Sequence, residues 1–160
     1  MLSFSKNTLY RCVLALLSCV AVTSAADVVV IKGRDIGKFD FKSTLDPNII
    51  KTSDSATGEA THFGRYRLDA SELVNLATLE ITGGWFTMTA ANGDTLTGVY
   101  SGKGHLTETP SVILYDVAGP ITGGTGRFAG TTGALAFFGS ADLAAGTFTD
   151  TVLAVVSGTK

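Results

Sequence analysis

The chain has few of the residues that cross-link a protein or bind a metal ion. Its only cysteines, Cys12 and Cys19, lie within the first 26 of its 160 residues, so the rest of the chain can form no disulfide. Its only histidines, His62 and His105, have no carboxylate at the spacing of a metal site, which needs three or four ligands. The sequence therefore predicts no metal, and a packed core and hydrogen bonds must stabilise the fold.

Charge is also scarce, and there is no basic excess. Asp and Glu number 14 against 12 Lys and Arg, and charged residues make up 16% of the chain. Without the first 26 residues, which include Lys6 and Arg11, 10 basic residues face 14 acidic ones and the net charge is −4. A chain with no basic cluster is a poor partner for nucleic acid or for an anionic membrane surface, and we expect neither.

The first 26 residues have the three-part pattern of a signal peptide. Lys6 and Arg11 supply a positive start, residues 12–22 are apolar, and residues 24–26 form a small-residue cleavage site. The apolar run is shorter than the roughly 18 residues of a membrane span, so we expect no stable span.

Cleavage after Ala26 leaves 134 residues, 27–160, which is enough for one domain. Within it, residues 27–56 are the less certain part, an N-terminal strand and loop. Residues 16–19 loosely resemble a lipobox, but lipid anchoring at Cys19 is the less favoured alternative, because three apolar residues follow the cysteine. We expect export to the periplasm or out of the cell.

The remaining sequence has the pattern of an all-β protein. Glycines recur at a spacing near ten residues, which is the turn rhythm of sandwiches and barrels, and Thr-, Val- and Phe-rich runs lie between them. No segment has a convincing amphipathic helix. The strands we expect are residues 28–32, 62–68, 75–81, 85–90, 95–100, 112–117, 134–138 and 148–156.

One hairpin is predicted with its turn. Residues 85–90 and 95–100 alternate with a two-residue period on either side of Asn92-Gly93. This dipeptide is the strongest short-range hairpin signal, because a type I′ turn needs positive φ at both of its central residues.

About eight strands without a disulfide favour a small closed, mainly antiparallel barrel. An open sheet would present long unpaired edges, and closure removes them. A two-sheet β-sandwich is the alternative. An eight-stranded barrel either fills its interior with side chains or holds one small ligand there.

Residues 123–130 read Gly-Gly-Thr-Gly-Arg-Phe-Ala-Gly and superficially resemble a dinucleotide-binding loop. Such a loop must open a helix, and the segment that follows is too short and too rich in glycine for one. We predict instead a tight turn between two strands, in which Arg127 donates hydrogen bonds to loop carbonyls. The structural residues of this turn are Gly123, Gly124, Gly126, Arg127 and Gly130.

The string from Ile121 to Gly130 resembles the Gly-Gly-Thr-Gly-Lys/Arg-Phe turn of plant dirigent proteins, which share an eight-stranded barrel with the allene oxide cyclases. Residues 60–66, 91–98 and 146–148 look still more like a group of exported bacterial barrel proteins related to them. The resemblance covers roughly residues 57–158. It implies an often trimeric barrel that uses no cofactor and shapes an apolar intermediate, so that it cyclises or couples in one stereochemical sense.

The chain departs from that family at functional positions. In dirigent proteins an Arg-Glu pair lies just ahead of the proline that leads into the glycine turn, whereas Val117, Ala118 and Gly119 precede Pro120 here. The Glu, Asn and Cys constellation of the plant cyclases has no match either. The resemblance therefore implies the fold and leaves the plant activities aside.

Polar side chains that share parity with an apolar strand face are candidate functional groups. Asp150 has the parity of Phe148 and Val152, which would direct its carboxylate into the barrel; a solvated position at the barrel mouth is the favoured alternative. A buried carboxylate has a raised pKa that suits general acid–base chemistry. The candidate catalytic residues are Asp150, Tyr100 and Tyr115.

Aromatic side chains with polar tips suit a pocket for an apolar ligand. The candidate ligand contacts are Trp85, Phe86, Met88 and Arg65. Ordinary core packing is the alternative for the aromatic residues, and a polar outer face is the favoured one for Arg65.

Three functions remain open. The first is an exported barrel that binds a small apolar ligand, and the second is a cofactor-free cyclase or isomerase. The third is a structural or surface-interaction barrel with a filled core. The volume of the interior separates the third from the first two.

Overall fold

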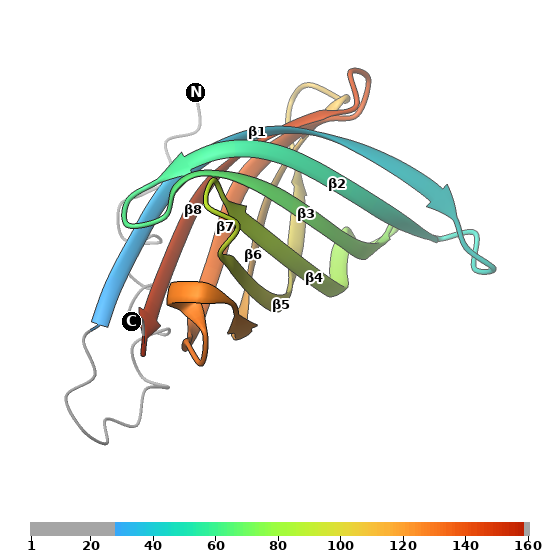
Figure 1. The fold of residues 1–160 in the computed structure, drawn as a ribbon. Coiled ribbons are helices and arrows are strands. Elements are labelled where there is room, and N and C mark those ends of the chain that lie inside the picture. The colour runs from blue at the N-terminus through green and yellow to red at the C-terminus, as the bar shows by residue number, and fades with distance from the viewer. Residues whose placement is uncertain (1–27, 159–160) are drawn as a thin grey trace.

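The structure is a computed structural model that describes residues 28–158, and these residues form one closed antiparallel barrel (Figure 1). Each strand pairs with the next in the chain, and β1 pairs with β8, so the sandwich alternative is wrong. The strands are β1 (Val28–Ser43), β2 (Ile49–Ala60), β3 (Gly64–Asn75), β4 (Glu80–Ala90), β5 (Thr95–Leu106), β6 (Val112–Gly124), β7 (Thr132–Asp142) and β8 (Thr147–Ser157). The predicted signal peptide and Cys19 lie outside the described residues.

The predicted hairpin is present as β4 and β5, with Thr89 opposite Thr95. The predicted type I′ turn is wrong. The Gly93 N–H donates to the Ala90 carbonyl at 2.9 Å, and the positive-φ residues of the described chain include Gly93 (φ 90°) but not Asn92. A four-residue connection, rather than the two-residue loop of a type I′ hairpin, has room for one ordinary turn followed by one left-handed glycine.

Two strand predictions fail at their ends. Residues 75–81 were expected to be a strand, but β3 ends at Asn75 and β4 begins at Glu80, with a turn between them. His62 lies in the turn between β2 and β3 with a φ of 59°.

The N-terminal segment whose structure was least certain from the sequence also forms strands. β1 continues to Ser43, and β2 follows it although seven of its 12 residues are Ser, Thr, Lys, Asp or Glu. Pairing with β1 on one side and β3 on the other overrides the weak strand propensity of β2. The two long strands end in a hairpin that extends away from the barrel (Figure 1).

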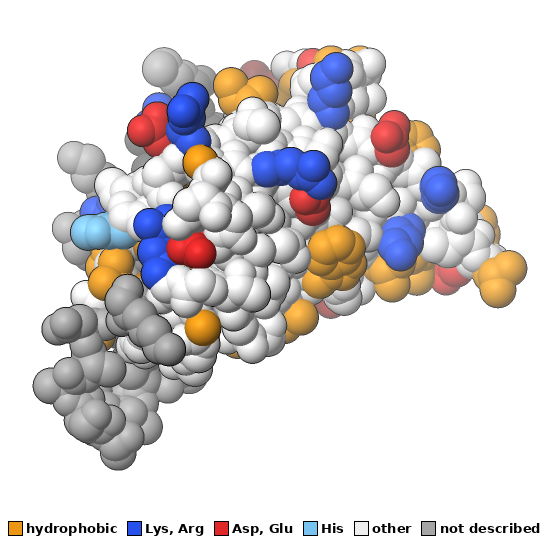
Figure 2. Space-filling model, in the orientation of Figure 1, with side chains coloured by type: hydrophobic (Ala, Val, Ile, Leu, Met, Phe, Trp, Pro, Cys, Tyr) orange, Lys and Arg blue, Asp and Glu red, His pale blue; other side chains and the backbone are white. Residues whose placement is uncertain are grey.

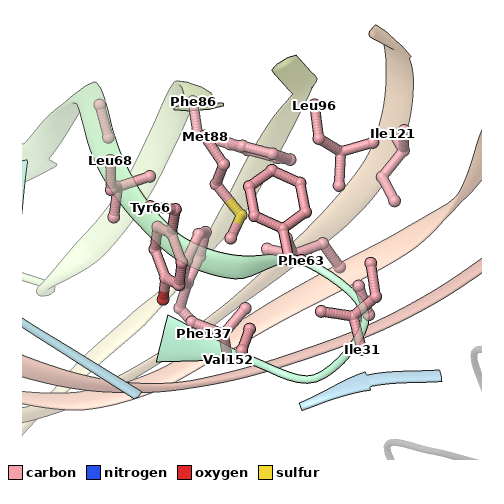
Figure 3. Packing of buried hydrophobic residues seen from close by; sticks show 14 of the residues in the cluster. Ile31, Phe63, Tyr66, Leu68, Phe86, Met88, Leu96, Ile121, Phe137 and Val152 are labelled. Carbon is pink, nitrogen blue, oxygen red and sulfur yellow. The ribbon is translucent and has the colours of Figure 1, made fainter. Parts of the chain in front are cut away.

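One end of the barrel is filled by packed side chains. Phe63, carried by the turn after β2, points inward among Met88 and Ile31 (Figure 3). Its ring stacks on that of Phe128 with centroids 4.7 Å apart. These contacts close this end against solvent, since all four side chains are at most 2% exposed.

The glycine-rich octapeptide connects β6 to β7 and lies at the closed end. It forms a short 3₁₀ turn, η1 (Gly126–Phe128), and β7 begins at Thr132, so the octapeptide does not open an α-helix as a dinucleotide-binding loop would. Gly126 and Gly130 have φ values of 58° and 77°, a conformation that favours glycine. Gly123 and Gly124 are the last residues of β6.

Arg127 fastens this turn to the turn between β2 and β3. Its Nη2 donates to the Phe63 carbonyl at 2.9 Å, so the predicted hydrogen bond to a carbonyl is present, but the carbonyl belongs to another turn. The guanidinium also lies over the Phe128 ring, 4.9 Å from its centroid. The contact joins segments 64 residues apart and holds the closed end together.

On the outside, the face shown in Figure 2 is mostly uncharged, with basic and acidic side chains placed singly or in small groups. Among the helical segments of residues 28–158, none has the length and apolar character to cross a membrane.

Candidate functional site

The other half of the barrel encloses a chamber of about 400 Å³. This volume lies within the range of small-molecule pockets, roughly 300–1,000 Å³. The chamber reaches the end of the barrel where Leu76, Leu79 and Leu143 lie in the turns after β3 and β7. It is thus opposite the end closed by Phe63 and Phe128.

The chamber exists because small residues occupy inward positions near this end. Ala70, Gly104 and Ala141 line it, where larger side chains would fill the space. Deeper in the barrel the lining changes to Leu68 and Phe137, both buried, which form part of the floor. Most of the wall is therefore apolar.

Asp150 and Tyr115 form the first polar pair of the chamber. The Tyr115 hydroxyl donates to Asp150 Oδ1 at 2.6 Å, and Asp150 is 7% exposed. Burial, helped by the nearby charge of Asp35, raises the pKa of Asp150 to about 8. Gly139 lies opposite both residues in the ladder, and a side chain at that position would collide with the Asp150 carboxylate and the Tyr115 ring.

Asp35 lies next to this pair, directly opposite Asp150 in the β1–β8 ladder. It is 2% exposed and accepts a hydrogen bond from the Tyr66 hydroxyl at 2.7 Å. Burial raises the pKa of Asp35 to about 6, while the hydrogen bonds from Tyr66 and Asp150 oppose that shift. Asp35 does not line the chamber itself, but its charge acts on Asp150.

A second polar pair, Tyr100 and Glu72, extends toward Asp54. The Tyr100 hydroxyl donates to Glu72 Oε2 at 2.6 Å, and the Thr52 hydroxyl donates to Asp54 Oδ2 at 3.3 Å. Burial, followed by the charge of Glu72 and a hydrogen bond with it, raises the pKa of Asp54 to about 9. Asp54 therefore retains its proton at neutral pH.

The three tyrosines of these pairs are fixed as donors. Burial and the neighbouring carboxylates raise the pKa of Tyr66, Tyr100 and Tyr115 well above the ordinary value of 10.0. Each phenol keeps its proton and orients one carboxyl oxygen of its partner. The remaining capacity of the carboxyl groups is available for hydrogen bonds or for proton exchange.

Apart from the tyrosines, the ionisable side chains of the chamber wall are all acidic. The ionisable lining residues other than tyrosine are Asp54, Glu72 and Asp150, and none of the described residues around the chamber is Lys, Arg or His. No group of three or more His, Cys, Asp or Glu within residues 28–158 is arranged to hold a metal ion.

The structure brings the three candidate catalytic residues together around one chamber. Tyr100, Tyr115 and Asp150 all line it. Asp150 is buried and points into the barrel, so the favoured interpretation, a solvated position at the mouth, is wrong. The two-residue period of β8 indicated the correct face of this strand. Their catalytic role remains a prediction.

The four candidate ligand contacts do not line the chamber. Trp85 is 46% exposed on the outer face, because the two-residue period that turns Phe86 inward turns Trp85 outward. Arg65 is also outside, in a shallow surface depression, as the favoured alternative for it stated. Phe86 and Met88 do point inward, but they belong to the packed core beneath the chamber.

Three interior carboxyl groups were missed by the sequence argument: Asp35, Asp54 and Glu72. Glu72 has the parity of Leu68 and Ala70, the same signal that identified Asp150. The predicted strand containing Leu68 stopped there, however, and neither β2 nor the second half of β1 was predicted. Without those strands, the sequence could not indicate which of these carboxyl groups point into the barrel.

Comparisons of the chain with protein families, with curated proteins and with solved structures found no match.

Proposed function

We propose that this chain is an exported barrel that binds a small apolar ligand in the chamber. The observation that carries the proposal is the chamber itself, about 400 Å³ in volume, walled mainly by apolar side chains. Apolar surface removed from water there would supply most of the affinity. Export rests on the signal-peptide pattern of residues 1–26.

We further propose that the barrel is of the allene oxide cyclase and dirigent type. Eight antiparallel strands support this assignment, as does the glycine-rich turn between β6 and β7. The same proposal includes the assembly of three copies of the barrel into a homotrimer.

A cofactor-free cyclase or isomerase is the second candidate. Its support is the pair of phenol–carboxyl contacts, Tyr115–Asp150 and Tyr100–Glu72, that border an apolar chamber. A carboxyl group that holds its proton near neutral pH can donate it to a bound intermediate and recover it later, which is general acid–base catalysis. The chamber volume also favours both of these functions over a barrel with a filled core.

The decisive experiment measures uptake of a neutral hydrophobic fluorophore, N-phenyl-1-naphthylamine, by the protein expressed from its full sequence. An Ala70→Trp variant should abolish uptake, because Ala70 lines the chamber and an indole there occupies the ligand space. Val99→Trp is the matched control, since Val99 is 44% exposed on the outer face of β5.

Uptake by the parent chain and by Val99→Trp, but not by Ala70→Trp, supports a ligand-binding chamber. Absence of uptake by the parent chain, or equal uptake by Ala70→Trp, would exclude it. If uptake is confirmed, native mass spectrometry of the protein followed by denaturing extraction identifies a co-purified ligand, which can then be tested for turnover.

A further inference from the structure

We propose that the natural ligand of the chamber is an apolar amine, whose ammonium group binds among the carboxyl groups of Asp54, Glu72 and Asp150. This inference rests on the proposed ligand-binding function and specifies the chemical class of the ligand. Its basis is the distribution of polar groups around the chamber.

The carboxyl groups of the chamber wall are complementary to a cationic ligand. The three carboxyl groups come from β2, β3 and β8, and no basic side chain of residues 28–158 lines the chamber with them. Asp35 adds a fourth carboxyl group just behind Asp150. An anionic ligand would find no basic partner in this poorly solvated space, whereas a cation can pair with carboxylates that form when it binds.

The chamber wall has more hydrogen-bond acceptors than donors. The hydroxyl groups of Tyr100, Tyr115 and Thr52 each donate one bond to a chamber carboxyl group. Three carboxyl groups have more acceptor capacity than these three donors use, and the proton that Asp54 retains supplies only one further donor. An ammonium group carries three donors and can take the place of that proton.

The rest of the chamber wall is mainly apolar, which determines the body of the ligand. The lining beyond the carboxyl groups is aliphatic and aromatic, and Phe39, Ile113 and Phe148 contribute to it. The ligand therefore needs a compact hydrocarbon body as well as the amine. A strongly hydrated small cation would lack the apolar contacts.

Proton release is a consequence that can be measured. Because burial raises the pKa of Asp54 and Asp150 above neutrality, the empty chamber holds protons at pH 7. Binding of an ammonium group stabilises the carboxylates, so a proton passes to the buffer. Asp35 and Glu72 are the other carboxyl groups beside Asp150 and Asp54, and they accept hydrogen bonds from Tyr66 and Tyr100. These two tyrosines and Tyr115 stay protonated.

The experiment uses three ligands with one skeleton: 1-adamantylamine, 1-adamantanol and 1-adamantanecarboxylic acid. Their binding to the full-length protein is measured by isothermal titration calorimetry at pH 7.0 in two buffers with different ionisation enthalpies. We expect the amine to bind at least about tenfold more tightly than the alcohol, the acid to bind more weakly than either, and the amine alone to release protons.

Variants separate charge from packing. Glu72→Gln should reduce the preference for the amine over the alcohol to less than about threefold, and its N-phenyl-1-naphthylamine uptake is measured in parallel. Asp40→Asn, on the exposed face of β1, is the matched control and should change neither.

The outcomes distinguish the two proposals. If the neutral fluorophore enters the chamber but the amine binds no better than the alcohol, or the preference persists in Glu72→Gln, the amine inference is overturned and the ligand-binding function stands. If the fluorophore does not enter, the ligand-binding function fails, and the amine inference fails with it.

Discussion

The buried carboxyl groups make the stability of this barrel depend on pH in an unusual direction. Replacing Asp150 by Asn should stabilise the protein at high pH and have little effect near pH 4. Asp150 has a pKa of about 8 in the folded chain against 3.8 for an ordinary Asp. Since the folded pKa is raised, its favourable contribution is complete below about pH 4 and is lost as the pH rises through about 8.

The size of the effect follows from the shift. A rise from 3.8 to about 8, at 1.36 kcal/mol for each pH unit, corresponds to an upper limit of about 6 kcal/mol. The chamber is open at one end, and solvent access there screens the charge of the ionised Asp150 and lowers this figure. We therefore expect Asp150→Asn to be more stable than the parent chain by roughly 2–4 kcal/mol at pH 9.

The assay is urea unfolding at pH 4, 6, 7.5 and 9 for the parent chain, Asp150→Asn and the surface control Asp40→Asn. The free energies of unfolding of the parent and the control should fall together with rising pH, and that of Asp150→Asn should fall less. Parallel profiles for the parent chain and Asp150→Asn would refute the conclusion that Asp150 is a buried, proton-holding group.

Two further predictions concern single contacts. Arg127→Leu should lower the free energy of unfolding by about 1–3 kcal/mol in urea, because the Phe63 carbonyl loses its donor; a loss no larger than that of Arg67→Leu, on the outer face, would contradict this role. Tyr115→Phe should raise the pKa of Asp150 further by removing a hydrogen bond that lowers it. The resulting loss of stability should be greater at pH 9 than at pH 4 by about 1–2 kcal/mol, and an equal loss at both would contradict it.

The fold class was predictable because strand signals are local. A two-residue period and glycine-bounded turns identified the β4–β5 hairpin without knowledge of the rest of the chain. The rejection of a nucleotide loop at residues 123–130 was equally local, since it required only that no helix follow. β2 was missed for the opposite reason: its own residues are weak strand formers, and its two neighbours in the barrel hold it in place.

The candidate site was predictable only in part. Parity showed that Asp150 could face inward, because it depends on one strand alone. It could not distinguish Phe86 and Met88, in the packed half, from Tyr100, in the chamber, since the inward faces of β4 and β5 look alike in sequence. The position of a residue along the barrel depends on register and on the residues opposite.

The sequence by itself determined that this chain forms strands, where most of them turn, and which side of several strands is apolar. The tertiary structure decided that β1 closes on β8, that one end is packed while the other is hollow, and that each buried tyrosine meets a carboxyl group. Those tyrosines and their partners are 28 to 35 residues apart in the chain. Contacts across such distances arise from strand pairing and barrel closure, which no local pattern of residues encodes.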